Sequence, residues 1–138
     1  MRVYWDTNVF SYLVQGNGPF ANSVRRCAEI AAERGDEIGT SIFTIGELLV
    51  PYYASPQFDE GDPIRALVKS GQFAVLPFSM AVAERFAQVR ASFRVSAPDA
   101  IHIATALDFK ADVMLTNDKR LQKLLVKGLP IRTLEQFS

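Results

Sequence analysis

The sequence contains a single cysteine, Cys27, and a single histidine, His102, among its 138 residues. One cysteine excludes an internal disulfide framework and a CxxC zinc site, and it suits a reducing compartment. A Ser-His-Asp or Cys-His catalytic arrangement would have to use His102, and no nucleophile motif lies near that residue. The glycine-rich phosphate-binding patterns GxxxxGKS/T and GxGxxG are also lacking. The usual nucleophilic enzymes and nucleotide-binding folds are therefore disfavoured.

An excess of charge of one sign is lacking as well, because fifteen basic residues balance fifteen acidic ones. This balance neither favours nor excludes a polyanionic partner, although acids gathered in one place would leave the remaining surface basic on average. No apolar run approaches the length of a membrane span, and Asp6 interrupts the apolar residues after Arg2 too early for a signal peptide. We therefore expect a cytoplasmic protein with no membrane association.

Short runs rich in β-branched and aromatic residues alternate with helical patterns along the chain. The runs predict strands at Arg2–Trp5, Glu37–Thr40, Gln72–Leu76, Asp112–Leu115 and Pro130–Arg132. The apolar spacing predicts helices that include Thr44–Ala54, Pro63–Lys69 and Asn117–Lys127, and residues 15–19 and 55–63 are predicted to be loops. The chain has the length of one domain. The alternation predicts an α/β fold over residues 1–138, with a twisted, mostly parallel sheet of about five strands flanked by helices.

Four acidic side chains fall where the predicted strands lead into helices, namely Asp6, Glu47, Asp99 and Asp118. Helix capping alone can explain each of them, since Thr44-x-x-Glu47 and Ser96-x-x-Asp99 fit the capping box and the other two fit caps or first-turn acids. A parallel sheet, however, would bring these positions to one edge, where ligands bind. Two carboxylates about 4 Å apart repel by about 4 kcal/mol at an effective dielectric of 20, whereas a cap contributes about 1 kcal/mol.

A cluster of acids is tolerable only if its members protonate, stay hydrated or hold a cation. Oxygen ligands without a Cys or His cage favour Mg²⁺ or Mn²⁺. We therefore expect Asp6 to form one wall of a cation site, with Thr7 and Asn8 helping to start the following helix. We also expect Asp6→Asn and Asp99→Asn each to leave the fold intact and to stabilise the metal-free protein by relieving repulsion.

The segments VYWDTNVF, SIFTIGELL, SAPDAIHIATAL and DVMLTNDKRL contain the four acids in order and span nearly the whole chain. Together they resemble a PIN domain, and specifically a VapC-type toxin of a toxin–antitoxin pair. The resemblance implies a Mg²⁺- or Mn²⁺-dependent endoribonuclease that hydrolyses RNA, forms a homodimer and is masked by a cognate VapB-like antitoxin. It also implies that a metal lies among Asp6, Glu47, Asp99 and Asp118, with Asn8 and Thr116 as supporting residues.

Other residues are less specific. His102 lies three positions after Asp99 and could touch substrate or orient that acid, but we favour a satisfied structural histidine. Lys119 and Arg120 directly follow Asp118 and are candidates for contacts to RNA phosphates. The apolar excess of residues 43–53, with Phe58 nearby, predicts a self-association or partner surface.

Three other functions fit parts of the same pattern. A phospho-acceptor receiver domain is also doubly wound, but it usually has adjacent acids after the first strand, where this chain has Asp6 alone. A PIN-domain nuclease that processes RNA outside a toxin–antitoxin system stays open, because only analogy and the short chain favour a toxin. A non-catalytic PIN-like scaffold that binds RNA or protein also stays open, although a scaffold has no reason to keep four repelling carboxylates.

Overall fold

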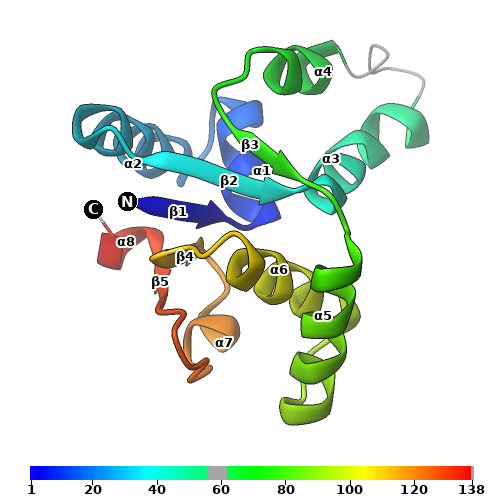
Figure 1. Cartoon of the computed structure of the whole chain (residues 1–138). Helices are drawn as coiled ribbons and strands as arrows, with labels where there is room; N and C mark the ends of the chain where they lie inside the picture. The colour runs from blue at the N-terminus through cyan, green and yellow to red at the C-terminus, as the bar shows by residue number, and fades with distance from the viewer. Residues whose placement is uncertain (56–61, 138) are drawn as a thin grey trace.

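The computed structural model describes residues 1–55 and 62–137, and a five-stranded sheet runs through its middle (Figure 1). The strand order is β3-β2-β1-β4-β5, and every neighbouring pair is parallel. The strands are β1 (Arg2–Trp5), β2 (Glu37–Ser41), β3 (Ala74–Leu76), β4 (Val113–Thr116) and β5 (Ile131–Thr133). The predicted α/β class and parallel sheet are confirmed.

Helices cover both faces of the sheet. They are α1 (Thr7–Gln15), α2 (Ala21–Arg34), α3 (Ile42–Ala54), α4 (Asp62–Lys69), α5 (Met80–Ser92), α6 (Ala97–Asp108), α7 (Lys119–Gln122) and α8 (Leu134–Phe137). Residues of α1, α2, α3, α4 and α8 form the core on one face, and residues of α5, α6 and α7 form the core on the other. No helix within the described ranges is long and apolar enough to cross a membrane.

The central strand β1 is buried from Val3 to Trp5 and contributes side chains to both cores. Because side chains alternate along a strand, Val3 and Trp5 enter one core and Tyr4 enters the other. Cys27 lies in the first of these cores as a free, buried thiol. Both aromatic residues of β1 are thus packing residues, and the position of Tyr4 brings its hydroxyl to the opposite side of the sheet from Trp5.

Two helix predictions were wrong at their boundaries. Helix α3 begins at Ile42, because the Ser41 hydroxyl caps it by accepting the Phe43 N–H at 3.0 Å. Thr44 therefore forms no capping box, and Glu47 lies in the second turn instead of the first. The predicted Asn117–Lys127 helix is confined to α7, because the chain turns back through a bridge between Val126 and Leu129 to reach β5.

The predicted loop at 55–63 overlaps helix α4, which already begins at Asp62. Most of that segment, together with Phe58, lies outside the described residues. Within the described part of α3, Val50 and Tyr53 are exposed, whereas Leu48 belongs to the core. Part of the apolar excess of this helix is therefore on the surface, as predicted.

Gly39 on β2 is expected to tolerate no side chain. A Cβ atom at this position would lie 2.6 and 2.7 Å from ring atoms of Phe109, which is itself buried. We expect Gly39→Ala to lower the free energy of unfolding by about 1–3 kcal/mol, the usual cost of overpacking a core. Urea unfolding measures this loss.

Gly46→Ala is the matched control for that substitution. Gly46 lies inside α3, and a Cβ there meets nothing within 4 Å outside the helix. Alanine should stabilise the helix by up to about 1 kcal/mol. Equal stability changes in the two variants would contradict the close approach of β2 to Phe109.

Candidate active site

The carboxyl ends of the neighbouring strands β1 and β4 place two polar residues side by side. Asp6 follows Trp5 directly, and its N–H donates to Leu115 O on β4 at 3.0 Å. Thr116 ends β4, and its hydroxyl donates to Asp6 Oδ2 at 2.8 Å. Three further acids come from segments later in the chain: Glu47 lies on α3, Asp99 lies on α6, and Asp118 precedes α7.

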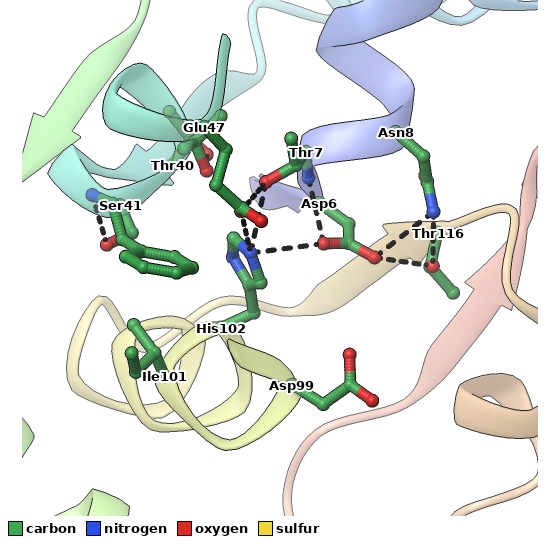
Figure 2. A network of polar contacts seen from close by, with 12 residues as sticks. Asp6, Thr7, Asn8, Thr40, Ser41, Glu47, Asp99, Ile101, His102 and Thr116 are labelled. Carbon is green, nitrogen blue, oxygen red and sulfur yellow. Dashed lines mark hydrogen bonds and ion pairs between the residues drawn. The ribbon is translucent and has the colours of Figure 1, made fainter. Parts of the chain in front are cut away.

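Asp6 is 6% exposed and accepts hydrogen bonds from several directions (Figure 2). Its Oδ1 caps α1 by accepting the Thr7 N–H at 2.8 Å, and His102 Nε2 lies 3.4 Å from the same oxygen. Its Oδ2 accepts from Asn8 Nδ2 at 3.3 Å as well as from Thr116. Asp6 therefore caps α1, as the capping interpretation predicted, and it also lies at the centre of a polar cluster.

Asn8 has a different role from the one predicted for it. Its side chain does not cap α1, since Asp6 does so. Instead its amide donates to Asp6, and its Oδ1 accepts the Asn117 N–H at 3.1 Å. Asn8 thus ties the start of α1 to the segment that follows β4, which fits its predicted supporting place beside the acids.

Glu47 points from α3 toward Thr7 and His102. Its Oε1 accepts from the Thr7 hydroxyl at 2.5 Å and lies 3.2 Å from His102 Nε2. Partial burial raises the pKa of Glu47, but the two hydrogen bonds together lower it by more than burial raises it. The net pKa of Glu47 therefore lies below the usual value. Glu47 is thereby held as an anion near Asp6.

Asp99 lies in the first turn of α6, where the Ser96 hydroxyl caps the helix by accepting the Asp99 N–H at 3.3 Å. Partial burial is the main cause that raises the pKa of Asp99; the Ser96 hydrogen bond opposes it, and the negative charges of Asp6 and Asp118 raise the pKa by smaller amounts, with His102 lowering it least. Asp6 and Asp118 thus lie close enough to Asp99 to influence its charge. Figure 2 shows the Asp99 side chain on the side of the site where Asp6 and Thr116 lie.

Asp118 caps α7 and is linked to Asp6 through one hydroxyl. Its Oδ1 accepts the N–H groups of Arg120 and Leu121, and its Oδ2 lies 3.4 Å from the Arg120 guanidinium. Partial burial raises its pKa, but these hydrogen bonds and the Arg120 charge lower it to below the usual value. The Thr116 hydroxyl accepts the Asp118 N–H at 3.1 Å while it donates to Asp6. Thr116 therefore sets the spacing between the first acid and the last.

His102 is buried and satisfied, in agreement with the structural role favoured from the sequence. Its neighbours, however, are Tyr4, Thr7 and Glu47, and Asp99 is not among its hydrogen-bond partners. Sequence reasoning missed Tyr4 and Thr7 as members of the site. The only available signal for Thr7 was its place beside Asp6, and nothing in the sequence pattern pointed to the Tyr4 hydroxyl.

The basic candidates lie at the rim of the site. Lys119 and Arg120 are exposed, and the Arg120 side chain retains 90% of its accessible surface while contacting Asp118. Both residues lie at the start of α7 and are open to solvent. The structure thus keeps them beside the fourth acid.

The acids fit a hydrated cation better than a directly caged one. Within residues 1–55 and 62–137, no three acidic, histidine or cysteine side chains gather closely enough to hold a metal ion by themselves. The charges of Asp6 and Asp118 nevertheless contribute to the raised pKa of Asp99. Mg²⁺ characteristically keeps several waters and takes only one or two carboxylates. This oxygen donor set suits such an ion and does not suit tetrahedral zinc.

Comparison with known proteins gives one family and several similar folds. A family model described as PIN domain matches residues 3–125. VapBC2 from Rickettsia felis, bound to a DNA fragment from its promoter, has a TM-score of 0.77 and 16% identity, over 96% of this chain and 98% of that chain. DNA-bound VapBC from Salmonella typhimurium has a TM-score of 0.74 and 20% identity, over 97% and 98%.

A third similar structure is VapC20 from Mycobacterium tuberculosis, described as a toxin that cleaves the sarcin-ricin loop. It has a TM-score of 0.69 and 15% identity, over 86% of this chain and 92% of that chain. At these identities the likeness is one of fold. No curated protein matches this chain.

Proposed function

This chain belongs to the PIN-domain family, and on that premise we propose that it is a metal-dependent endoribonuclease, the toxin of a VapBC-type toxin–antitoxin pair, with residues 1–138 forming one domain. One observation carries the proposal. Asp6, Asp99 and Asp118 gather at the carboxyl edge of the sheet, where the Thr116 hydroxyl links Asp6 to Asp118 and the charges of both add to the burial that raises the pKa of Asp99. Helix capping does not require such mutual repulsion, whereas a cation site does.

The residues that would hold Mg²⁺ or Mn²⁺ are Asp6, Asp99 and Asp118, with Glu47 beside them. Such a cation, when bound, supplies a water of lowered pKa and neutralises charge on the phosphodiester. Asp6 is oriented by three hydrogen-bond donors, with His102 Nε2 3.4 Å away, so it would serve as a fixed ligand. One of these carboxylates would accept the proton of the attacking water.

The basic residues at the rim would bind the RNA backbone. Lys119 and Arg120 would contact phosphates of the RNA next to the scissile one, because they are exposed and directly follow Asp118. Such contacts hold the backbone over the acids without reading its bases. The base preference of the enzyme must then come from other residues.

The proposed partners are a VapB-like antitoxin and a second copy of the chain. Two of the similar structures are VapBC complexes that this chain matches over 96% and 97% of its length. Val50 and Tyr53 of α3 expose apolar side chains, which suits a surface that is covered in a complex. We propose the cytoplasm as the place where the chain meets RNA.

Cleavage of RNA tests the proposal. The purified chain is incubated with a labelled pool of RNA in EDTA, then with Mg²⁺ or Mn²⁺, beside DNA of the same sequence. We expect RNA fragments only when metal is present and none from DNA. RNA binding without cleavage would instead support the scaffold, and fragments formed in EDTA would exclude a metal mechanism. Growth arrest on expression, absent for Asp99→Asn, separates a toxin from an RNA-processing nuclease.

A further inference from the structure

Two residues outside the four-acid scheme, His102 and Thr7, link Glu47 with Asp6 through short polar contacts (Figure 2), and Tyr4 extends this chain into the core. The Tyr4 hydroxyl lies 2.8 Å from His102 Nδ1. On the other side of the ring, His102 Nε2 lies 3.1 Å from the Thr7 hydroxyl, 3.2 Å from Glu47 Oε1 and 3.4 Å from Asp6 Oδ1. One imidazole therefore connects a phenol in the core with two carboxylates of the site.

The hydrogen positions in this chain follow from the donors around Tyr4. The Ser41 N–H donates to the Tyr4 oxygen at 3.2 Å, so the phenol hydrogen needs an acceptor elsewhere. His102 Nδ1, 2.8 Å from the Tyr4 oxygen, is placed to accept it. Burial first, and then the charge of Asp6, raise the pKa of Tyr4, which keeps the phenol neutral and able to donate.

An Nδ1 that accepts a hydrogen bond fixes the tautomer of the ring. In a neutral imidazole the hydrogen then resides on Nε2, which faces the oxygens of Glu47, Thr7 and Asp6. The Thr7 hydroxyl gives its own hydrogen to Glu47, so its oxygen can only accept from His102. Glu47 Oε1 thus receives both the Thr7 hydroxyl and the His102 N–H.

We propose that Tyr4 and His102 are positioning residues: Tyr4 holds His102 as the Nε2–H tautomer, and that N–H fixes the Glu47 carboxylate beside Asp6. Glu47 comes from a helix with a partly exposed side chain, and two donors from other elements restrain it. A single N–H shared between two anions also offsets part of their repulsion. The catalytic benefit rests on the proposed nuclease function, but the tautomer and the placement of Glu47 do not.

Because His102 is the only histidine of the chain, its tautomer can be read without assignment. A long-range ¹H–¹⁵N correlation spectrum of the untagged, ¹⁵N-labelled protein at neutral pH shows which ring nitrogen carries hydrogen. We expect a protonated Nε2 and a bare Nδ1 in the wild type, and a mixture of tautomers in Tyr4→Phe. A wild-type ring with hydrogen on Nδ1, or on both nitrogens, would overturn the proposal.

Tyr12→Phe is the matched control for this spectrum. Tyr12 also carries a hydrogen-bonded hydroxyl, which accepts from Asn117 Nδ2 at 3.2 Å and does not contact His102. Its removal should leave the ring tautomer and the rate of RNA cleavage unchanged. A tautomer that changes equally in Tyr12→Phe and Tyr4→Phe would show that the ring senses general packing and not the Tyr4 hydroxyl.

The effect on catalysis is tested with Tyr4→Phe, His102→Gln and the double variant. The Gln side chain keeps an N–H donor but has no acceptor at the position of Nδ1. Each single variant should lower kcat by about 10- to 100-fold, the usual cost of losing a residue that orients a ligand, with KM for RNA unchanged. Since Tyr4 acts only through His102, the double variant should be no slower than His102→Gln alone.

The outcomes separate the two proposals. Losses that multiply in the double variant, or that appear in KM instead of kcat, would overturn the positioning role. A wild-type chain that has the expected tautomer but cleaves no RNA would overturn the nuclease function and leave the hydrogen-bond chain in place. Thermal unfolding of each variant shows whether a lost rate reflects a lost fold.

Discussion

Asp99→Asn is expected to reduce RNA cleavage to less than about a hundredth of the wild-type rate and to raise the melting temperature of the metal-free protein. Loss of a residue that merely orients a metal ligand typically costs 10- to 100-fold in activity, so loss of a ligand itself should cost at least about 100-fold. The gain in stability has a separate cause. Burial disfavours the Asp99 anion, the charges of Asp6 and Asp118 add to that cost, and a neutral amide removes both effects.

The pH dependence of the stability gain follows from the raised pKa of Asp99. The folded state holds this proton more tightly than the unfolded state, so its stabilising effect is present at low pH and is lost as the pH rises through the folded pKa. At neutral pH the ionised Asp99 therefore destabilises the fold, and the Asn variant should melt higher. At a pH below about 3.9, the ordinary pKa of an aspartate, the two proteins should melt together.

Calorimetry across this pH range measures the difference, and Asp108→Asn is the control. Asp108 ends the same helix, and its half-exposed carboxylate lies 3.9 Å from Arg85, away from the other acids. We expect Asp108→Asn to change neither cleavage nor the pH dependence. Full activity in Asp99→Asn, or a lower melting temperature at neutral pH, would refute the shared electrostatic environment of the three acids.

Asp6→Asn is expected to reduce RNA cleavage as strongly as Asp99→Asn does, but to destabilise the protein. Asp6 accepts from Thr7, Asn8 and Thr116 and lies within 3.4 Å of His102 Nε2. An amide offers a single acceptor oxygen, so at least one of these donors would face an NH₂ group. An unsatisfied buried polar group costs about 1–3 kcal/mol, and we expect a loss of that size in urea unfolding.

This expectation corrects the one drawn from the sequence, which gave Asp6→Asn and Asp99→Asn the same stabilising effect. Repulsion between acids is common to both positions, but only Asp6 is surrounded by donors. Opposite signs of the two stability changes would support this distinction. A stabilised Asp6→Asn would mean that repulsion outweighs the hydrogen bonds.

The sequence was a good guide to the sheet and to the edge where the acids lie. Strand β1 was placed at its observed ends, because Asp6 marks the change from an apolar run to a helix start. The start of α3 was misplaced, since Ser41 both ends β2 and caps the helix. Local spacing could not distinguish Ser41 from Thr44 as the cap.

Contacts between distant segments were beyond the reach of the sequence pattern. Tyr4 and His102 are 98 positions apart, and Thr116 and Asp6 are 110 positions apart. Periodicity shows which face a residue occupies but not which side chain it meets on the neighbouring element. The expectation that the four acids form a site therefore came from the order of the motifs, and the partners of each acid only from the structure.

The proposed metal site is tested most directly by thermal unfolding of the purified chain, first in EDTA and then with increasing Mn²⁺ or Mg²⁺, beside Asp99→Asn. The test requires no knowledge of the RNA target. Binding to the folded state stabilises it by about 2.7 kcal/mol at a ligand concentration of about 100 times Kd. We predict a melting temperature that rises with metal concentration in the wild type and stays constant in Asp99→Asn. A wild-type melting temperature that changes with neither ion, even with a non-cleavable oligonucleotide present, would contradict a metal site at these acids.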